Sequence, residues 1–345
     1  MGEKKKTVET VAVIGATGAV GSEIVRLLIE RKFPMENLRL FASSGGKKIH
    51  SLPVEKFDNL EGVDLAFFAA GSKVSKEWIP KAGCLCIDSS SAFRKTHPLI
   101  IPEINPHAIE GNILTSPNCA ATVLLMPLFS LHRLFRVKRV VMSTYQAASG
   151  GGARLVSELK QETHSYLEGR SYPHILPFPY AFNLFPHNTP LDASGYVEEE
   201  LKIAFETRKI LEDDSIHLSA TCVRVPILRA HSIAANVEFH RPFSLEKIYE
   251  ALQSVPGLKI FEDRAHNRFA TPFDATGKEE VFCGRVRIDP SQPNTLEFWA
   301  VGDQLLKGAA LNAVQIAEVA GTNVRLSPFP SPPENHLGPD PAAGK

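Results

Sequence analysis

The chain lacks the features that would place it on nucleic acid or in a membrane. Its 38 basic and 38 acidic side chains leave no net charge over 345 residues, so no long-range attraction draws it to nucleic acid or to an anionic lipid surface. No uncharged apolar run reaches the length of about 18 residues that a membrane-spanning helix needs. The sequence therefore predicts no nucleic-acid partner and no membrane partner, whereas small charged metabolites need only a local patch.

Cysteine is scarce, and its spacing indicates neither a disulfide framework nor a metal site. The chain has five cysteines, and the close pair Cys84 and Cys86 lacks a companion pair. The basic start of the chain has no apolar signal core before the first strand-like run. We therefore expect a reducing, cytoplasmic location, free thiols and no bound metal.

Short apolar runs alternate with helical patterns over roughly the first third of the chain. The runs at 11–15 and 38–43 flank a segment whose apolar residues recur at i, i+4, i+7 and i+8 from Val20. This order predicts an α/β fold, with a Rossmann-type, doubly wound, mostly parallel sheet at the N-terminus. Further strands are expected at 63–71, 84–88 and 112–116.

The second part of the chain has a different pattern, because several apolar runs follow one another without a helix between them. This predicts a second α+β domain with a mixed or antiparallel sheet. Its expected strands are 137–149, 219–228, 232–240, 281–288 and 295–302, and its expected helices are 153–166 and 196–212.

These patterns divide the chain into two expected domains and a tail. We expect a dinucleotide-binding domain at 1–120, completed by a helix at 304–321 that returns to it. A catalytic and dimerisation domain is expected at 121–303. Residues 325–345 are rich in proline, which predicts an extended tail.

Three glycines follow the first expected strand at three-residue intervals and lead into the first expected helix. Gly15 would allow the tight turn, Gly18 a close approach of a diphosphate, and Gly21 close packing of helix on strand. The start of the helix then offers amide donors to phosphate. The pattern favours a dinucleotide held by this loop, including Thr17 and Ala19; a glycine-rich turn without a ligand is the alternative.

The end of the second expected strand bears on the choice of nucleotide. It carries Ser43, Ser44 and Lys47 but no carboxylate that would bind the ribose hydroxyls of NAD. Serines and lysines suit a 2′-phosphate better, so this turn favours NADP. A simple solvated turn at Lys47 and Lys48 remains the alternative.

Cys119 stands in the stretch SPNCAAT, directly before a segment with helical character. A thiol in the first turn of a helix has a lowered pKa, because the amides and the helix dipole favour the thiolate. Pro127 weakens the prediction for the later part of that helix. The alternative is a buried core cysteine, as expected for Cys84, Cys86, Cys222 and Cys283.

Seven motifs in one order settle this choice by resemblance. They are GATGAVG, SSSAFR, SPNCAAT, STYQAASGGG, EEELKIAFETRKIL, RVPILRAHS and KGAALNAVQIAE. Together they resemble the aspartate-semialdehyde dehydrogenase family from residue 10 to about residue 321. The resemblance implies NADPH-dependent conversion of aspartyl phosphate to aspartate semialdehyde, a step toward lysine, diaminopimelate, methionine and threonine.

The resemblance assigns the reaction to four residues. Cys119 is the implied nucleophile, which forms a thioester that a nicotinamide hydride reduces. Asn118 is implied near the acyl and phosphate groups, although it could also be a helix cap. Gln146 is implied to position the reacting group, and His231 to act as acid and base.

The same resemblance assigns the substrate and the cofactor. Arg224 is the implied clamp on the substrate carboxylate, and Glu199 is implied to bind its ammonium. Lys202 and Arg94 are the implied phosphate ligands, although Glu199 and Lys202 alone could form a modest surface ion pair. The implied cofactor contacts are Gly15, Thr17, Gly18, Ala19, Val20, Ala70, Gly71, Ser72 and Asn312.

Two other functions remain as alternatives. N-acetyl-gamma-glutamyl-phosphate reductase shares the glycine loop and the cysteine, but its cysteine usually follows glycine rather than Asn118. A catalytically silent NADP-binding relative should have lost the nucleophile or the histidine. Substrate and inorganic phosphate are the expected partners, with a homodimer or homotetramer assembled through residues such as 149–152.

Overall fold

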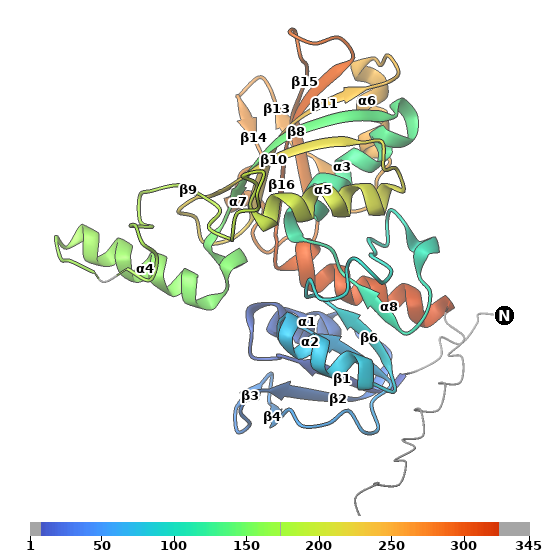
Figure 1. The fold of residues 1–345 in the computed structure, drawn as a ribbon, viewed down its shortest axis with the longest axis vertical. Helices are drawn as coiled ribbons and strands as arrows, with labels where there is room; N and C mark the ends of the chain where they lie inside the picture. Colours follow the sequence, from blue (N-terminus) through green and yellow to red (C-terminus); the bar gives the residue numbers. More distant parts are fainter. Residues whose placement is uncertain (1–7, 173, 324–345) are drawn as a thin grey trace, which may run out of the picture.

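The protein is described by a computed structural model that covers residues 8–172 and 174–323. Two seven-stranded sheets form two units that lie one above the other in Figure 1, and a small two-stranded sheet joins the second unit. The predicted tail at 325–345 lies outside the described residues. Among the helices of the described ranges, none has the length and apolar character needed to cross a membrane.

The first sheet confirms the predicted Rossmann-type fold. Its strands lie in the order β3-β4-β2-β1-β5-β6-β7, and every neighbouring pair is parallel except β3 with β4. The strands are β1 (Val8–Ile14), β2 (Met35–Ala42), β3 (Lys48–Ile49), β4 (Leu52–Lys56), β5 (Leu65–Phe68), β6 (Leu85–Asp88) and β7 (Ile113–Thr115). The short hairpin strands β3 and β4 were not predicted.

Helices cover both faces of this sheet, as its alternating inward side chains require. Val11 and Val13 of β1 face α1 (Ala19–Glu30) and α8 (Leu311–Asn323), whereas Ala12 and Ile14 face α2 (Ser72–Trp78). The short helices η1 (Ile79–Lys81) and η2 (Pro106–Ala108) complete this unit. The neighbours on each face follow from the two-residue period of a strand.

The glycine loop between β1 and α1 has the geometry that its spacing predicts. Gly15 has φ +89°, and a Cβ there would lie 2.7 Å from the carbonyl oxygen of Ala69. A Cβ on Gly21 would lie 2.1 Å from the Gly15 oxygen, a distance that no side chain tolerates. Both positions therefore need glycine for the helix to start directly against the strand.

The second sheet is mixed, as predicted. Its order is β12-β15-β16-β11-β8-β10-β9, in which β8 with β10 and β12 with β15 are parallel and the other pairs antiparallel. The strands are β8 (Val137–Gln146), β9 (Phe185–Pro186), β10 (His217–Arg224), β11 (His231–Phe239), β12 (Leu258–Ile260), β15 (Val281–Ile288) and β16 (Thr295–Gly302). The small sheet pairs β13 (Glu262–Asp263) with β14 (Arg268–Phe269).

Three helices pack on one face of the second sheet and form its main core. They are α3 (Cys119–Phe135), α5 (Glu198–Leu211) and α6 (Leu245–Gln253). Pro127 weakened the prediction for the later part of this helix, but α3 continues through that proline to Phe135. Burial of its neighbours Met126 and Leu128 in the core stabilises the helix by more than the hydrogen bond lost at the proline, which has no backbone N–H, costs.

Helix α4 (Ala153–Leu167) extends sideways from the second sheet together with the segment that leads to β9 (Figure 1). This extension has its own small core, in which Leu159 packs with Tyr180 and Phe185. The short helices η3 (Ala148–Gly151) and α7 (Pro272–Ala275) complete the second unit.

The last described segment returns to the first unit, as predicted. A π-helical stretch, η4 (Leu306–Ala310), leads into α8, and both contribute buried residues to the core around α1. Lys307 is buried within this segment, and its ammonium donates hydrogen bonds to Glu103, Asn312 and Gln315. A buried cation is tolerated here because three oxygen acceptors surround it.

We expect Lys307→Met to destabilise the protein by about 3 kcal/mol, because it removes a buried ammonium and leaves the partly buried Glu103 carboxylate without its cation. The measurement is the urea midpoint followed by tryptophan fluorescence, since Trp78 reports on the first unit and Trp299 on the second. The matched double variant Lys307→Met/Glu103→Leu should regain part of the loss. Equal midpoints for Lys307→Met and the unmodified protein would contradict this reading of the ion pair.

Candidate active site

Cys119 is the first residue of α3 and lies where the chain leaves the first sheet for the second unit. Asn118 caps the helix, and its side-chain oxygen accepts hydrogen bonds from the amides of Ala120 at 2.8 Å and Ala121 at 3.2 Å. A Cβ on Gly308 of the returning segment would lie only 2.9 Å from the Cys119 Cβ. The sulfur is therefore held at the contact between the two units.

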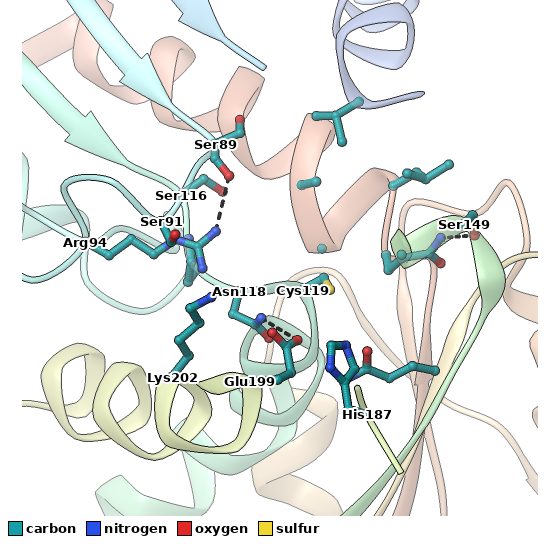
Figure 2. Close-up of a pocket in the computed structure, with 18 of the residues that line it drawn as sticks. Ser89, Ser91, Arg94, Ser116, Asn118, Cys119, Ser149, His187, Glu199 and Lys202 are labelled. Atoms are coloured by element: carbon teal, nitrogen blue, oxygen red, sulfur yellow. Dashed lines mark hydrogen bonds between the residues drawn. The ribbon is translucent and has the colours of Figure 1, made fainter. Parts of the chain in front are cut away.

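A pocket around Cys119 brings together seven of the residues predicted for catalysis and for binding of substrate and phosphate, from distant parts of the chain (Figure 2). They come from both units, which explains why no single stretch of sequence shows the site. Residues from α1, from the strand ends and from the returning segment close the rest of the pocket. The predicted residues that line it are Arg94, Asn118, Cys119, Gln146, Glu199, Lys202 and Arg224.

Helix α5 supplies one wall of the pocket. Glu199 and Lys202 are three residues apart and both face the pocket, as their helical spacing predicts (Figure 2). The side-chain amide nitrogen of Asn118 donates a hydrogen bond of 2.7 Å to the Glu199 carboxylate. Lys202 lies 2.8 Å from Glu198 and is partly exposed, so its ammonium can also reach a ligand.

A residue that the sequence analysis missed, Glu206, joins this wall to the cysteine. Its carboxylate is buried and accepts hydrogen bonds from the Arg94 guanidinium at 2.9 Å and from the Asn118 backbone amide at 2.5 Å. Burial raises its pKa, and Arg94 opposes that shift. The sequence held one signal, because Glu206 follows Glu199 by seven residues and therefore lies on the same face of α5.

Arg224 ends β10 beside Gln146, which ends the parallel strand β8. Its guanidinium donates to the Ala147 carbonyl at 2.9 Å and to the His187 Nε2 at 2.9 Å. Burial, followed by the charge of Arg224, lowers the pKa of His187 to about 4, so its ring is neutral and can accept. His187 also lines the pocket, and no motif in the sequence pointed to it.

His231 lies behind the pocket wall rather than in it. It is fully buried, and a Cβ on Gly150 would lie 2.9 Å from its Nε2, so any side chain at position 150 would collide with the ring. The Ala147 amide donates to its Nδ1 at 3.1 Å. Burial lowers the pKa of His231 to about 3, so the neutral ring carries its proton on Nε2. That atom has no hydrogen-bond partner among the described residues.

The thiol does not have the lowered pKa that its place at a helix start suggested. Burial raises the pKa of Cys119 to about 12, and the Glu199 carboxylate raises it further, against the opposing effects of Arg224 and Arg94. The expectation of a thiolate in the ligand-free protein is therefore wrong. Desolvation by the pocket outweighs the amides of the first helical turn.

A second hollow lies at the glycine loop and holds several of the residues predicted for the cofactor. It is lined by Gly15, Thr17, Gly18, Ser43 and Ala70. Aromatic side chains from the end of α2 and from the residue that follows β4 line it as well. No side chain in the described ranges caps the first-turn amides of α1. This arrangement suits a nucleotide whose phosphates take those amides.

The two hollows lie near each other, although no residue lines both. Val20 in the first turn of α1, next to Ala19, lines the cysteine pocket. Ser72 follows Gly71 at the start of α2, and its hydroxyl lies 3.1 Å from that of Ser91, another lining residue of the cysteine pocket. A ligand that reaches across α1 from the glycine loop would therefore approach Cys119.

Three of the residues predicted for the cofactor lie elsewhere. Ser44 and Lys47 are exposed beyond the end of β2 and do not line the hollow. Asn312 is fully buried, donates to the Ile100 carbonyl and to Ser116, and accepts from Lys307. Its polar atoms are thus used inside the protein, and it faces neither hollow.

Comparison with known proteins agrees with this geometry. Residues 10–112 match the family described as semialdehyde dehydrogenase, NAD binding domain, and residues 125–307 match semialdehyde dehydrogenase, dimerisation domain. An aspartate-semialdehyde dehydrogenase of Synechocystis sp. is 48% identical over 325 residues, which cover 90% of this chain and 96% of that protein. The chain belongs to the aspartate-semialdehyde dehydrogenase family.

The likeness to this family extends to solved structures. The crystal structure of aspartate semialdehyde dehydrogenase II complexed with ASA from Vibrio cholerae is 36% identical and has a TM-score of 0.88. The match covers 92% of this chain and 99% of that one. Cys119 lies between the two regions that match the semialdehyde dehydrogenase families, at the junction of the two units.

We expect alkylation of Cys119 by iodoacetamide in the ligand-free protein to accelerate about tenfold per pH unit from neutral pH upward. The reason is that only the thiolate reacts and its pKa is about 12. Mass spectrometry of the labelled peptide measures the rate, and the other cysteines are buried. A rate that levels off near neutral pH would show a lowered pKa instead.

The same measurement tests the effect of Glu199. Because its carboxylate raises the pKa of the thiol, Glu199→Gln should speed alkylation at a given pH. Glu198→Gln is the matched control, since this neighbouring carboxylate is exposed and pairs with Lys202. Equal rates in the two variants would remove Glu199 as a cause of the raised pKa.

Proposed function

We propose that the chain catalyses the reductive dephosphorylation of L-4-aspartyl phosphate to L-aspartate 4-semialdehyde with NADPH, through a thioester on Cys119. The observation that carries this proposal is the set of charges around one thiol. Arg224 and Glu199 match an α-carboxylate and an α-ammonium, and Arg94 and Lys202 match a phosphate. The names of the relatives support the same reaction.

The charges also distinguish the two acyl-phosphate reductases considered from sequence. Glu199 is a carboxylate that faces the pocket, and a free ammonium satisfies it. An N-acetylated substrate has no such cation, so it would leave this partly buried carboxylate without a cationic partner, with only its hydrogen bond from the Asn118 side chain. The site therefore favours an unmodified amino acid over an N-acetylglutamyl substrate.

In the proposed reaction the Cys119 sulfur attacks the acyl carbon and the phosphate leaves. Asn118 and Gln146, which line the pocket with Cys119, would stabilise the oxyanion of the tetrahedral adduct that forms before the phosphate leaves. The neutral His231 ring, whose Nε2 lies beside Gly150, would donate a hydrogen bond from that atom to the substrate oxygen and so stabilise its negative charge. The Ala147 amide fixes this tautomer, because an imidazole that accepts at Nδ1 can only donate from Nε2.

Substrate binding itself would activate the nucleophile. The Glu199 carboxylate raises the pKa of the thiol, and an ammonium placed against it cancels part of that effect. A phosphate beside Arg94 and Lys202 acts in the opposite direction until it leaves. The thiolate is thus favoured when the amino-acid part is bound, which protects the free protein from side reactions.

The glycine-loop hollow is the proposed site of the nucleotide, whose reduced form, NADPH, would supply the hydride that reduces the thioester. Gly15, Thr17, Gly18 and the amides of Ala19 and Val20 would hold its diphosphate. Ser43 lines that hollow at the end of β2, and Ser44 and Lys47 follow it at the surface. They are the proposed partners of the 2′-phosphate, since no carboxylate stands at this strand end.

The remaining proposals concern assembly and location. A family region described as a dimerisation domain spans residues 125–307, which supports a homodimer as the working unit or as half of a homotetramer. We keep the cytoplasm as the proposed location, on the basis of the free cysteines. The domain limits at residues 120 and 303 also remain predictions.

The decisive experiment is phosphate-dependent reduction of NADP with aspartate semialdehyde. Cys119→Ala should lower kcat by about 10⁴-fold or more, because no other described thiol lines the pocket. N-acetylglutamate semialdehyde should give little activity, and NAD should replace NADP poorly. Equal rates for Cys119→Ala and the unmodified protein would overturn the mechanism.

The phosphate site has its own test. Lys202→Met should raise the KM for phosphate about 10- to 100-fold with a smaller effect on the KM for the semialdehyde, because a charge-assisted hydrogen bond contributes about 1.5–3 kcal/mol. Lys95→Met is the matched control, since this exposed neighbour of Arg94 does not line the pocket. The assignment fails if both variants change the KM for phosphate equally.

A further inference from the structure

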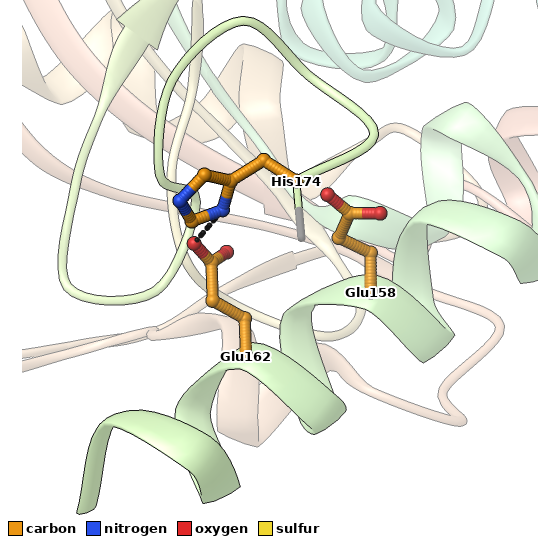
Figure 3. A group of neighbouring side chains, drawn as sticks. All are labelled: Glu158, Glu162 and His174. Carbon is orange, nitrogen blue, oxygen red and sulfur yellow. Dashed lines mark ion pairs between the residues drawn. The ribbon is translucent and has the colours of Figure 1, made fainter. Parts of the chain in front are cut away.

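A second cluster of ionisable side chains lies far from the cysteine pocket, on the extension formed by α4. Glu158 and Glu162 are four residues apart and therefore share one face of this helix. His174 faces them from the segment that follows the helix (Figure 3). One ligand atom from each of the three side chains lies within 4.8 Å of the others.

Both carboxylates are buried, which is costly for two neighbouring anions. Glu158 is 1% exposed and Glu162 is 4% exposed. One oxygen of each carboxylate is already used by the backbone. The Ile175 amide donates to Glu158 Oε1 at 2.6 Å, and the amides of Tyr180 and Ala181 donate to Glu162 Oε2 at 2.7 and 3.0 Å.

The other oxygen of each carboxylate receives no hydrogen bond from the backbone of the described residues. Glu158 Oε2 is buried and has no hydrogen-bond partner in the described part of the chain. Glu162 Oε1 lies 2.7 Å from His174 Nδ1, and it too accepts no well-aligned hydrogen bond from a described residue. Anchoring the following loop explains one oxygen per carboxylate, but it leaves a buried acceptor on Glu158 that nothing satisfies.

We propose that Glu158, Glu162 and His174 bind one divalent transition-metal ion of the Zn²⁺ type. Two carboxylates and one imidazole form a mixed oxygen and nitrogen donor set, which suits Zn²⁺ or Co²⁺ better than Mg²⁺ or Ca²⁺. The ion takes the free oxygen of each carboxylate and Nδ1 of a neutral His174, and water completes its coordination.

The surroundings have the form that metal sites need. Backbone amides hold the other oxygen of each carboxylate and so fix the direction of the two anions, as partners of ligating carboxylates do elsewhere. Ligands of tetrahedral Zn²⁺ lie about 3.3–3.5 Å apart, a little closer than the spread of this cluster. Glu162 Oε1 and His174 Nδ1 are already 2.7 Å apart, so the wider separation involves Glu158, and small side-chain rotations would bring the three atoms to this spacing.

The ion would fasten the loop after α4 to that helix. This loop carries Tyr180, whose hydroxyl donates to the Val225 carbonyl next to Arg224, and it ends near His187. His187 in turn accepts from Arg224 in the cysteine pocket. We therefore expect the metal to stabilise the fold of this extension, without taking part in the reaction.

The test uses the full-length chain freed of metal with a chelator, in a Cys119→Ser background that removes the active-site thiol as a competing ligand. Co²⁺ is the probe, followed by its visible absorption and by equilibrium dialysis. We expect one Co²⁺ per chain, displaced by Zn²⁺. Glu158→Gln and His174→Ala should each weaken binding by about 100-fold or more. Glu158→Gln keeps the acceptor for Ile175, and His174 is exposed, so both variants should fold.

The matched control lies on the same helix. His164 and Glu168 form an exposed pair at 3.3 Å, so the double variant His164→Ala/Glu168→Gln removes the same residue types outside the cluster and should bind Co²⁺ normally. Zn²⁺ should also slow hydrogen exchange at the Ile175, Tyr180 and Ala181 amides in the Cys119→Ser protein but not in His174→Ala. Binding weaker than about 1 mM, or equal binding in the cluster and control variants, would overturn the proposal.

Discussion

The buried carboxylate of Glu206 connects the parts on which the cysteine pocket depends. One oxygen accepts from Arg94, which lies between β6 and β7 of the first sheet, and the other accepts from the backbone amide of Asn118, directly before the cysteine. Its own helix, α5, belongs to the second unit and presents Glu199 and Lys202 to the same pocket. A single buried anion thus sets the spacing between the proposed phosphate ligands, the helix start and the proposed ammonium site, and it is tolerated because two donors compensate its burial.

The electrostatics of the pocket explain why its residues had to come from both units. A thiol in a desolvated pocket is poorly ionised, and the two cations Arg94 and Arg224 favour the thiolate while Glu199 opposes it. Neither sheet alone supplies this balance, since Arg94 follows β6 and Arg224 ends β10. His187 contributes without a charge, because burial beside Arg224 keeps its ring neutral and able to accept a hydrogen bond.

The sequence predicted most of the fold, and the reasons for success and failure are physical. The glycine loop and the alternation of buried strands and helices have local causes, so β1, α1 and the parallel sheet were predictable. The same holds for Glu199 and Lys202, whose shared face follows from helical spacing. The run of α3 through Pro127 was not predictable, because tertiary packing overrides the local cost of proline. The raised pKa of Cys119 depends on burial by residues 80 to 190 positions away, and Glu206 and His187 acquire their partners only in the folded chain.

The position of Cys119 between the units has a mechanical consequence. The chain crosses from the first unit to the second at this residue and comes back along η4, where Gly308 packs directly against the cysteine. Two crossings of the backbone at one point form a pivot, and atoms at a pivot move least when the bodies on either side rotate. If the two units open to admit ligands, the strand ends and the glycine loop travel while the sulfur stays nearly still. The nucleophile is then the fixed reference toward which both the amino acid and the nucleotide are carried as the units close.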